Sequence, residues 1–581
     1  MTPPPIQTCI AALNEAEMSD DTINRALRIA DDARTRIELN DIQPLCARLP
    51  DLSLEGAKAR AEAGRAILRD IAALRLEALP AELRLTIEII RGRAEYWAVQ
   101  EDWYWTVFDP SGGEMFAMFA PTPYGGGMAI ASVARELARM PLESDAARFR
   151  YLSALADFGV LLDQFAARTR GQAERGIYMP RAQAEAALRL LERWPREHGA
   201  TLQVSDTRLP GHDAFKRDVT RMIDAHVLGG FARLTAVLDA SYMGSVSDSV
   251  GMMHYPDGAE IYASLVRWHG STTLSPQEVH ELGLGRIAAI RADMAKVRAE
   301  ARFDGDDHAY RAHLDADPAW RADTPEAIAA VFRRYIDRLA PHLPDLFNTL
   351  PRATYGVRPL PDALTEAMTF GYYDPSTREH PHGDYVFNAR NLAKAGLFNL
   401  AALNYHELAP GHHLHLALQT ENESLPWLRS HTYPTAYVEG WAEYAATLAG
   451  EIGMYENPPE RFGRLVSEAF LACRLVVDTG MNALGWSLEQ ARAFMRDDSF
   501  MPETEIRSET LRYSSDIPGQ ALAYKLGEFA LQAMRTRMAK ALGDRFALAD
   551  FHDAVLGVGA IPLPLLERHI DTLIAAQRAP S

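Results

Sequence analysis

Residues 397–423 read LFNLAALNYHELAPGHHLHLALQTENE. The stretch is largely apolar, yet it carries four histidines within ten residues, and the first of them, His406, directly precedes Glu407. A zinc peptidase needs two neutral imidazoles on one metal ion and a carboxylate beside the first that can take a proton from water. A lone histidine in such a run is more often a hydrogen-bonded core residue, but this clustering favours a metal site.

The spacing of these histidines departs from the usual zinc-binding pattern on a helix. His-Glu-x-x-His places two histidines on one helical face, whereas here the fourth position after His406 is Pro410. On an undistorted helix, His406 and His412 would point about 120° apart. Pro410 lacks an N–H and clashes with the preceding turn, and Gly411 accepts unusual dihedral angles. A widened turn would return His412 to the face of His406, so His412 ranks first as the second ligand and His413 ranks next.

A third ligand is expected on a second apolar helix, TAYVEGWAEYAATLAGEIG, residues 435–453. Glu439 and Glu443 lie one turn apart there, and buried carboxylates are costly unless they are paired or bind a metal. Glu439 follows His406 by 33 residues, which suits a helix folded back against the first. We therefore predict that Glu439 is the third ligand. For Glu443, a solvated position or a pair with an arginine is the favoured interpretation.

The sequence around these segments predicts a mainly α-helical chain. Apolar residues recur at helical spacing over residues 71–99 and 149–170. Helix-capping patterns begin at Ser275, Thr324 and Ser487, where a hydroxyl side chain is followed by proline or by an acidic or amide residue in the first turn.

Strand-like sequence is confined to a short part of the chain. TFGYYDP (369–375) and DYVFNA (384–389) are aromatic and β-branched, and they predict a β-hairpin just before the histidine segment. Small polar residues in SYMGSVSDSVG (241–251) interrupt the helical pattern. We place a boundary there, between an N-terminal helical region, residues 1–245, and a C-terminal catalytic region, residues 246–581. The two regions together can also form one continuous unit.

Composition restricts the partners. The chain has 581 residues and a formal net charge of -18, with no basic stripe, so nucleic acids and anionic membrane surfaces are not expected partners. Three cysteines are too few and too scattered for a disulfide framework or a thiolate metal site. The N-terminus has no basic residue before Arg25, and no apolar run of about 18 residues occurs. We therefore expect a soluble cytoplasmic protein; its oligomeric state does not follow from the sequence.

Four motifs in this order resemble the bacterial DUF885 family, which is grouped with the gluzincin-type metallopeptidases. The motifs are HELAPGHHLH, YVEGWAEYAATL, RLVVDTGMNALGW and RYSSDIPGQALAYKLG. Residues 250–287 also match the family pattern, so the resemblance covers roughly residues 250–580. It implies a large helical zincin-like body with a small sheet beside the active-site helix and a deep cleft.

The resemblance also implies roles for single residues. His406 and His412 would be metal ligands, Glu407 the general base and Glu439 the third ligand. Asn482 departs from the pattern, because the family usually has histidine at this position. The substitution points either to an altered substrate specificity or to a structural position where asparagine keeps one hydrogen bond.

The fourth motif offers donors to a tetrahedral oxyanion, a role that zincins often give to tyrosine, histidine or arginine. Arg512, Tyr513 and Tyr524 are the candidates. Aromatic residues are more often core than catalytic, and Arg512 can equally form a structural ion pair or bind a substrate carboxylate.

Taken together, these residues predict a zinc-dependent hydrolase of small peptides or peptide-like amides, with one zinc ion per chain and Glu407 as the base. Two alternatives remain open. One is a catalytically inactive zincin-like binding or scaffold protein, against which the intact Glu407 argues. The other keeps the site but hydrolyses a non-peptide amide. Neither the physiological substrate nor endo- or exo-action can be read from the sequence.

Overall fold

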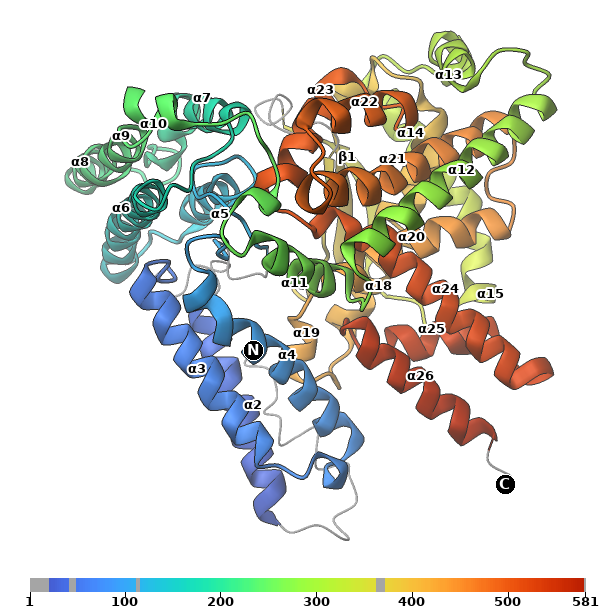
Figure 1. Ribbon diagram of the computed structural model, residues 1–581, viewed down its shortest axis with the longest axis horizontal. Coiled ribbons are helices and arrows are strands. Elements are labelled where there is room, and N and C mark those ends of the chain that lie inside the picture. The colour runs from blue at the N-terminus through green and yellow to red at the C-terminus, as the bar shows by residue number, and fades with distance from the viewer. Residues whose placement is uncertain (1–19, 41–48, 111–114, 362–370, 579–581) are drawn as a thin grey trace.

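The computed structural model describes residues 20–40, 49–110, 115–361 and 371–578. Helices dominate this part of the chain and surround one small sheet, which confirms the predicted mainly α fold (Figure 1). The start of the chain, where no secretory signal was expected, lies outside the described residues. None of the helices in these four ranges is long and apolar enough to cross a membrane. The cytoplasmic location remains a prediction.

The N-terminal helices are α2 (Asp20–Asn40), α3 (Leu54–Ala72), α4 (Ala81–Trp103), α5 (Gly126–Arg139), α6 (Asp145–Ala173), α7 (Arg181–His198), α8 (Asp213–Met222), α9 (Gly229–Thr235) and α10 (Ala240–Ser245). The predicted run at 71–99 belongs to two helices. α3 stops at Ala72, and α4 starts at Ala81, directly after Pro80. α3 and α4 pack closely at Gly64, where a Cβ atom would lie 2.6 Å from the carbonyl oxygen of Ala94. The run at 149–170 falls within α6, as predicted.

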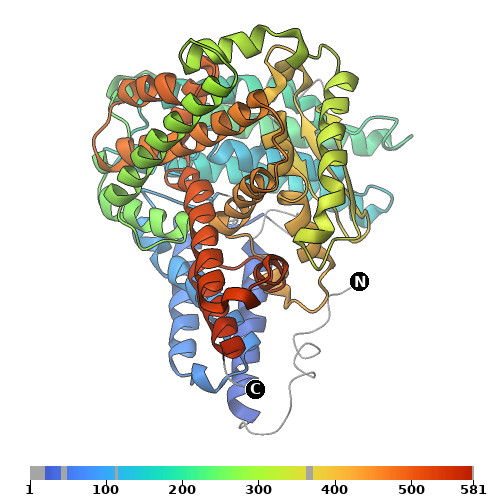
Figure 2. The same ribbon diagram turned by 90° about the vertical axis from the view of Figure 1, so that its right-hand side faces the viewer.

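The C-terminal helices form the other side of the molecule (Figures 1 and 2). They are α11 (Gly258–Gly270), α12 (Pro276–Glu300), α13 (Asp307–Ala316), α14 (Pro325–Leu339), α15 (Leu343–Leu346), α16 (Ala389–Leu392), α17 (Leu400–Glu407), α18 (His412–Glu421), α19 (Trp427–Ser430), α20 (Thr435–Glu451), α21 (Pro458–Ala483), α22 (Leu488–Asp498), α23 (Glu503–Leu511), α24 (Ala523–Leu542), α25 (Leu548–Leu556) and α26 (Leu563–Arg578). The predicted capping residues Ser275, Thr324 and Ser487 begin α12, α14 and α22, each accepting a backbone N–H with its side chain.

The sheet has three strands in the order β1-β3-β2, with bounds β1 (Thr354–Pro359), β2 (Gly371–Asp374) and β3 (His382–Phe387). β2 and β3 pair antiparallel and confirm the predicted hairpin, although residues 369 and 370 lie outside the described residues. β1 pairs parallel with β3 and was not predicted from the sequence. The sheet supplies buried side chains such as Tyr385 and Phe387 beside the histidine segment.

Close packing of helices in the C-terminal half positions the candidate site. α20 crosses α24 where Gly440 meets Gly527, and a Cβ atom on either glycine would overlap the backbone of the other helix. α21 is buried along most of its length and packs against α12, α17 and α24. One cluster of buried apolar side chains contains both Ala26 and Ile574, so the two sides share a core. The division at residue 245 stays a prediction.

Candidate metal centre

The histidine segment folds as two separate helices. α17 ends at Glu407 and α18 begins at His412, so the expected widened turn is a complete break in the helix. The turn has room for glycine alone at position 411. A Cβ atom there would overlap the carbonyl oxygen of His406 and lie 2.6 Å from the carbonyl oxygen of Tyr405. The indole N–H of Trp441, on α20, donates to the carbonyl of Pro410 at 2.9 Å and ties the break to the neighbouring helix.

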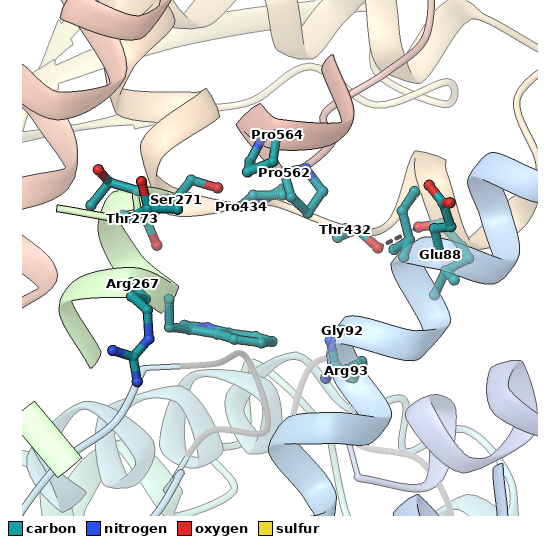
Figure 3. A pocket seen from close by; sticks show the side chains of 15 residues that line it. Glu88, Gly92, Arg93, Arg267, Ser271, Thr273, Thr432, Pro434, Pro562 and Pro564 are labelled. Atoms are coloured by element: carbon teal, nitrogen blue, oxygen red, sulfur yellow. Dashed lines mark hydrogen bonds between the residues drawn. The ribbon is translucent and has the colours of Figure 1, made fainter. Parts of the chain in front are cut away.

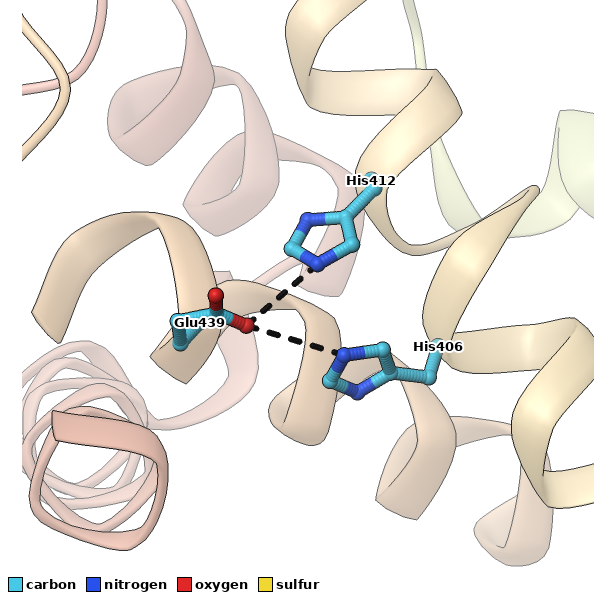
Figure 4. A group of neighbouring side chains, drawn as sticks. All are labelled: His406, His412 and Glu439. Carbon is cyan, nitrogen blue, oxygen red and sulfur yellow. Dashed lines mark ion pairs between the residues drawn. The ribbon is translucent and has the colours of Figure 1, made fainter. Parts of the chain in front are cut away.

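The break brings His406, His412 and Glu439 together (Figure 4). One ligand atom from each of the three lies within 4.8 Å of the others. The Oε2 atom of Glu439 is 3.7 Å from Nε2 of His406 and 3.4 Å from Nε2 of His412. The three side chains keep between 11% and 19% of their surface exposed, so the cluster is reachable from outside. The sequence had ranked these three residues first as ligands.

His413, the second-ranked ligand, points elsewhere. Its side chain is fully buried, with Nδ1 bonded to the Tyr373 hydroxyl at 2.7 Å and Nε2 to the carbonyl of Ala353 at 3.2 Å. Burial lowers the pKa of His413 to about 4. Both ring nitrogens of His413 therefore contact residues in or next to the sheet, and His413 is not part of the cluster.

Glu443 is buried between His406 and an arginine of α21. One carboxylate oxygen accepts from Nδ1 of His406 at 2.8 Å, and the other accepts from Arg464 at 2.9 Å. The arginine partner was among the sequence-based interpretations, but the solvated position was wrong, because the side chain is only 3% exposed. Sequence reasoning did not find the contact with His406. The signal available was the one-turn spacing from Glu439 on the same face.

The charges around His406 shift several pKa values. Burial lowers the pKa of His406, but Glu439 and Glu443 outweigh it and raise the pKa to about 10. Burial alone would raise the pKa of Glu439. Its contacts with His406 and His412 have the larger effect, and the pKa lies well below the ordinary value for glutamate. For Glu407, burial dominates and raises the pKa, against the opposing effect of His406 and His412. Glu407 therefore lies in the electrostatic surroundings of the same cluster.

His415 also supports the cluster, a role that sequence reasoning missed. Its Nε2 lies 3.2 Å from Nδ1 of His412, and the residue is almost fully buried. The spacing of three residues on α18 puts both rings on one helical face. Each candidate ligand histidine thus has a partner on the ring nitrogen that faces away from Glu439.

Tyr524 is the member of the fourth motif that reaches this site. Its ring stacks on that of His406, with centroids 6.3 Å apart and planes 13° from parallel. Burial, followed by the nearby Glu439, raises the pKa of Tyr524, so its hydroxyl stays protonated. The guanidinium of Arg474, on α21, lies 4.6 Å from the centre of the Tyr524 ring. Sequence reasoning missed Arg474, although an arginine within the apolar third motif was a usable signal.

Tyr513 and Arg512 take part in a separate buried network. The Tyr513 hydroxyl bonds to Glu509 and accepts from Arg474 at 2.7 Å, and the side chain is fully buried. Arg512 contacts Glu509 and the side-chain oxygen of Gln520, each at 3.3 Å. Among the described contacts, neither residue touches His406, His412 or Glu439. For Arg512, the ion pair is therefore the arrangement present.

Asn482 occupies a structural position. Its side-chain oxygen accepts from the backbone N–H of Met252 at 3.0 Å, and its amide donates to Asp478 and to the carbonyl of Tyr513 at 2.9 Å. The residue is fully buried. These bonds hold α21 against the segments before α11 and after α23.

Comparisons with known proteins agree on the fold. The DUF885 model, described as a bacterial protein of unknown function, matches residues 36–570. The crystal structure of a "putative lipoprotein" from Colwellia psychrerythraea is similar, with a TM-score of 0.82 and 24% identity over 95% of this chain and 97% of that one. A "putative lipoprotein of unknown function" from Shewanella oneidensis has a TM-score of 0.69 and 18% identity over 96% and 99% of the two chains.

Identities this low show a shared fold and carry no activity from one protein to the other. No match was found among curated proteins. The family model, by contrast, spans most of the chain, including all of the cluster residues and the segments that hold them. The protein therefore belongs to the DUF885 family of bacterial proteins.

Proposed function

We propose that the protein is a zinc-dependent hydrolase of peptide or peptide-like amide bonds, of the metallopeptidase type. The observation that carries the proposal is the convergence of His406, His412 and Glu439, with their ligand atoms within 4.8 Å of one another. Glu407 follows the first of these ligands directly in the chain. Two imidazoles, one carboxylate ligand and an adjacent carboxylate base form the usual residue set of such enzymes.

The donor set fits zinc. Glu443 on Nδ1 of His406 and His415 on Nδ1 of His412 leave the Nε2 atoms of both histidines directed at Glu439. Such outer hydrogen bonds fix the tautomer and orientation of ligand histidines. Zinc held by these three residues would supply an activated water molecule and polarise the substrate carbonyl.

The remaining residues then have distinct tasks. Glu407 accepts a proton from the attacking water and passes it to the leaving amine. Tyr524, whose ring stacks on His406, can donate its hydroxyl to the developing oxyanion. Arg474 lies against the Tyr524 ring, where a cation–π contact would help to orient it. Tyr513 and Arg512 contribute through their buried network and not by contact with substrate.

Metal content and turnover test the proposal together. The purified protein should contain about one zinc per chain by elemental analysis, and His406→Ala should lose it. Glu407→Gln should keep the metal but lose most of its activity, because glutamine cannot accept the proton. Glu439→Ala should instead lose metal affinity. The activity readout is release of new amines from a mixed peptide library.

The outcomes separate the candidate functions. Zinc with amine release that depends on Glu407 supports the peptidase. Zinc without amine release from any peptide, but with hydrolysis of non-peptide amides, supports the alternative of a non-peptide amide hydrolase. A metal-free wild-type protein, or unchanged metal content in His406→Ala, contradicts the proposal.

A further inference from the structure

A cavity of about 220 Å³ lies where the N-terminal and C-terminal halves of the chain meet. Its walls come from α4, from α11 and the residues just after it, from α19 through the start of α20, and from the residues around the start of α26. Figure 3 shows Pro434, Pro562 and Pro564 together on one side of the cavity and Gly92 of α4 on the other. Most of the lining is apolar, with the side chains of Ile89, Trp268, Leu428, Pro434, Pro562 and Pro564.

The cavity adjoins the helix that carries a candidate metal ligand. Thr435, the first residue of α20, lines the cavity, and Glu439 follows four residues later on the same helix. Residues four apart share a helical face and are separated by about 6 Å along the axis. The cavity therefore touches α20 one helical turn before Glu439, on the same face of the helix.

The side chains of α20 between the cavity and Glu439 differ in their exposure. Thr435, Val438 and Glu439 all retain partial exposure, whereas Ala436 and Tyr437 between them are buried. From Gly440 to Ala446 the helix is buried without interruption. Within α20, the partly exposed residues thus lie between Thr435 at the cavity and Glu439. This is expected if the cavity and the metal ligand belong to one binding surface.

We propose that this cavity receives an apolar side chain of the substrate, from the residue about two positions away from the scissile bond. The inference rests on the proposed function and names its substrate preference. An extended peptide advances about 3.3 Å per residue, so two residues cover about the same length as the 6 Å rise along α20 from Thr435 to Glu439. The cavity is smaller than the roughly 300–1,000 Å³ of a site for a whole small molecule, and its size and apolar walls suit one bulky side chain.

Gly92 offers a direct test. Gly92 lines the cavity, and a Cβ atom there would have no other atom within 4 Å, so a larger side chain at this position takes up cavity space without a clash. Gly92 lies inside α4, where glycine is the less stable choice, so Gly92→Ala and Gly92→Leu should both fold. Gly285→Leu is the matched control, since Gly285 is an exposed helical glycine of α12, also with open space, away from the cavity.

The assay compares kcat/KM for peptides that differ only two residues from the scissile bond, with phenylalanine, leucine or glycine there, in one series on each side of the bond. The wild type should favour phenylalanine and leucine over glycine on one side, on the order of tenfold or more. That preference should shrink in Gly92→Ala, vanish in Gly92→Leu and persist in Gly285→Leu. Calorimetric binding of the same peptides to the inactive Glu407→Gln protein should give the same ranking.

Two different failures can be told apart. If wild-type protein cleaves peptides but Gly92→Leu keeps the full preference, the cavity assignment is overturned while the proposed function stands. If the zinc-loaded protein neither cleaves nor binds any peptide, the proposed function fails, and the cavity inference fails with it.

Discussion

At the scale of single residues, the surroundings of His406 decide what the site can do. One ring nitrogen faces Glu439 and the other is held by Glu443, which in turn is held by Arg464. A carboxylate behind a ligand histidine fixes the ring and makes the metal-facing nitrogen more basic. Glu443 is therefore expected to act on the metal through His406, as a positioning residue.

We predict that Glu443→Gln weakens zinc binding about 10- to 100-fold, the usual loss when a partner of this kind is changed. Glutamine can still accept from His406, but it cannot neutralise the buried Arg464. Competition with a chelator measures the zinc affinity. Thr447→Val is the control, because Thr447 accepts from Arg464 at 3.0 Å without touching His406, and its zinc affinity should stay near wild type. Equal affinities for Glu443→Gln and wild type would contradict the assignment.

The two tyrosines of the fourth motif should respond in opposite ways to loss of the hydroxyl. Tyr524→Phe should lower kcat by about 10²- to 10³-fold with little change in KM or stability, because the donor acts in the transition state. Tyr513→Phe should leave kcat nearly unchanged but cost about 1–3 kcal/mol of stability, since Glu509 and Arg474 lose a buried partner. Steady-state kinetics and urea unfolding of both variants distinguish these effects, and the reverse pattern would exchange the two roles.

At the scale of secondary-structure elements, the break between α17 and α18 and the crossing of α20 over α24 build the site. The break lets two histidines six residues apart in the sequence face one point, which an unbroken helix would prevent. The glycines at the crossing bring α20 close enough to α24 for Glu439 and Tyr524 to lie at the same cluster. The close backbone contacts at both places therefore require glycine, and the geometry of the site depends on it.

We predict that Gly411→Ala disrupts both stability and zinc binding. The new methyl group would meet the carbonyl oxygens of His406 and Tyr405, and backbone atoms cannot move aside as a flexible side chain can. We expect a loss of about 1–3 kcal/mol in unfolding free energy and at least a tenfold lower zinc affinity. Gly285→Ala, in open space on α12, should be neutral or slightly stabilising. Normal zinc binding by Gly411→Ala would show that the turn tolerates opening.

At the scale of the whole molecule, buried carboxyl groups connect the N-terminal helices to the fourth motif. Asp516 accepts from the backbone N–H of Tyr124 at 3.1 Å and from the amide of Gln183. Asp478 accepts from Tyr262 at 2.7 Å and from the N–H of Gly519. Both carboxyls are fully buried or nearly so. The segment after α23 is thus held from two sides, one of them the N-terminal region.

Asp516→Asn should change the pH dependence of stability. Burial outweighs the hydrogen bonds to Asp516 and raises its pKa from 3.8 to about 7. The folded protein therefore binds this proton more tightly than the unfolded chain, and stability from this group is lost as the pH rises from about 4 to 7. Asparagine does not ionise, so the variant should gain stability relative to wild type across that window. Gln183 can adapt by turning its unbonded side-chain oxygen toward the new amide.

Urea unfolding of both proteins at several pH values between 4 and 8 measures this difference. Asp478, whose pKa burial also raises to about 7, titrates in both proteins and cancels in the comparison. A difference in unfolding free energy that does not vary with pH would contradict the raised pKa of Asp516.

The sequence by itself determined the helical class, the hairpin and the helix caps, and it ranked the three candidate ligands ahead of their neighbours. These features follow from local patterns: apolar spacing, capping residues, and histidines and carboxylates placed on apolar segments. The family resemblance, carried by four short motifs, was also readable from the chain alone. Strand β1 was not predicted, because it depends on parallel pairing with β3, which lies more than twenty residues later in the chain.

Only the tertiary structure decided between neighbours in the sequence. His412 reaches the cluster and His413 does not, because the break after Glu407 aims one ring at Glu439 while Tyr373 and Ala353 take both nitrogens of the other. In the same way, Tyr524 lies at the cluster and Tyr513 in a separate buried network. Glu439 faces both histidines, whereas Glu443 binds His406 and Arg464. In each pair the side chains are chemically alike, and their roles are set by partners far away in the sequence, which only folding brings into contact.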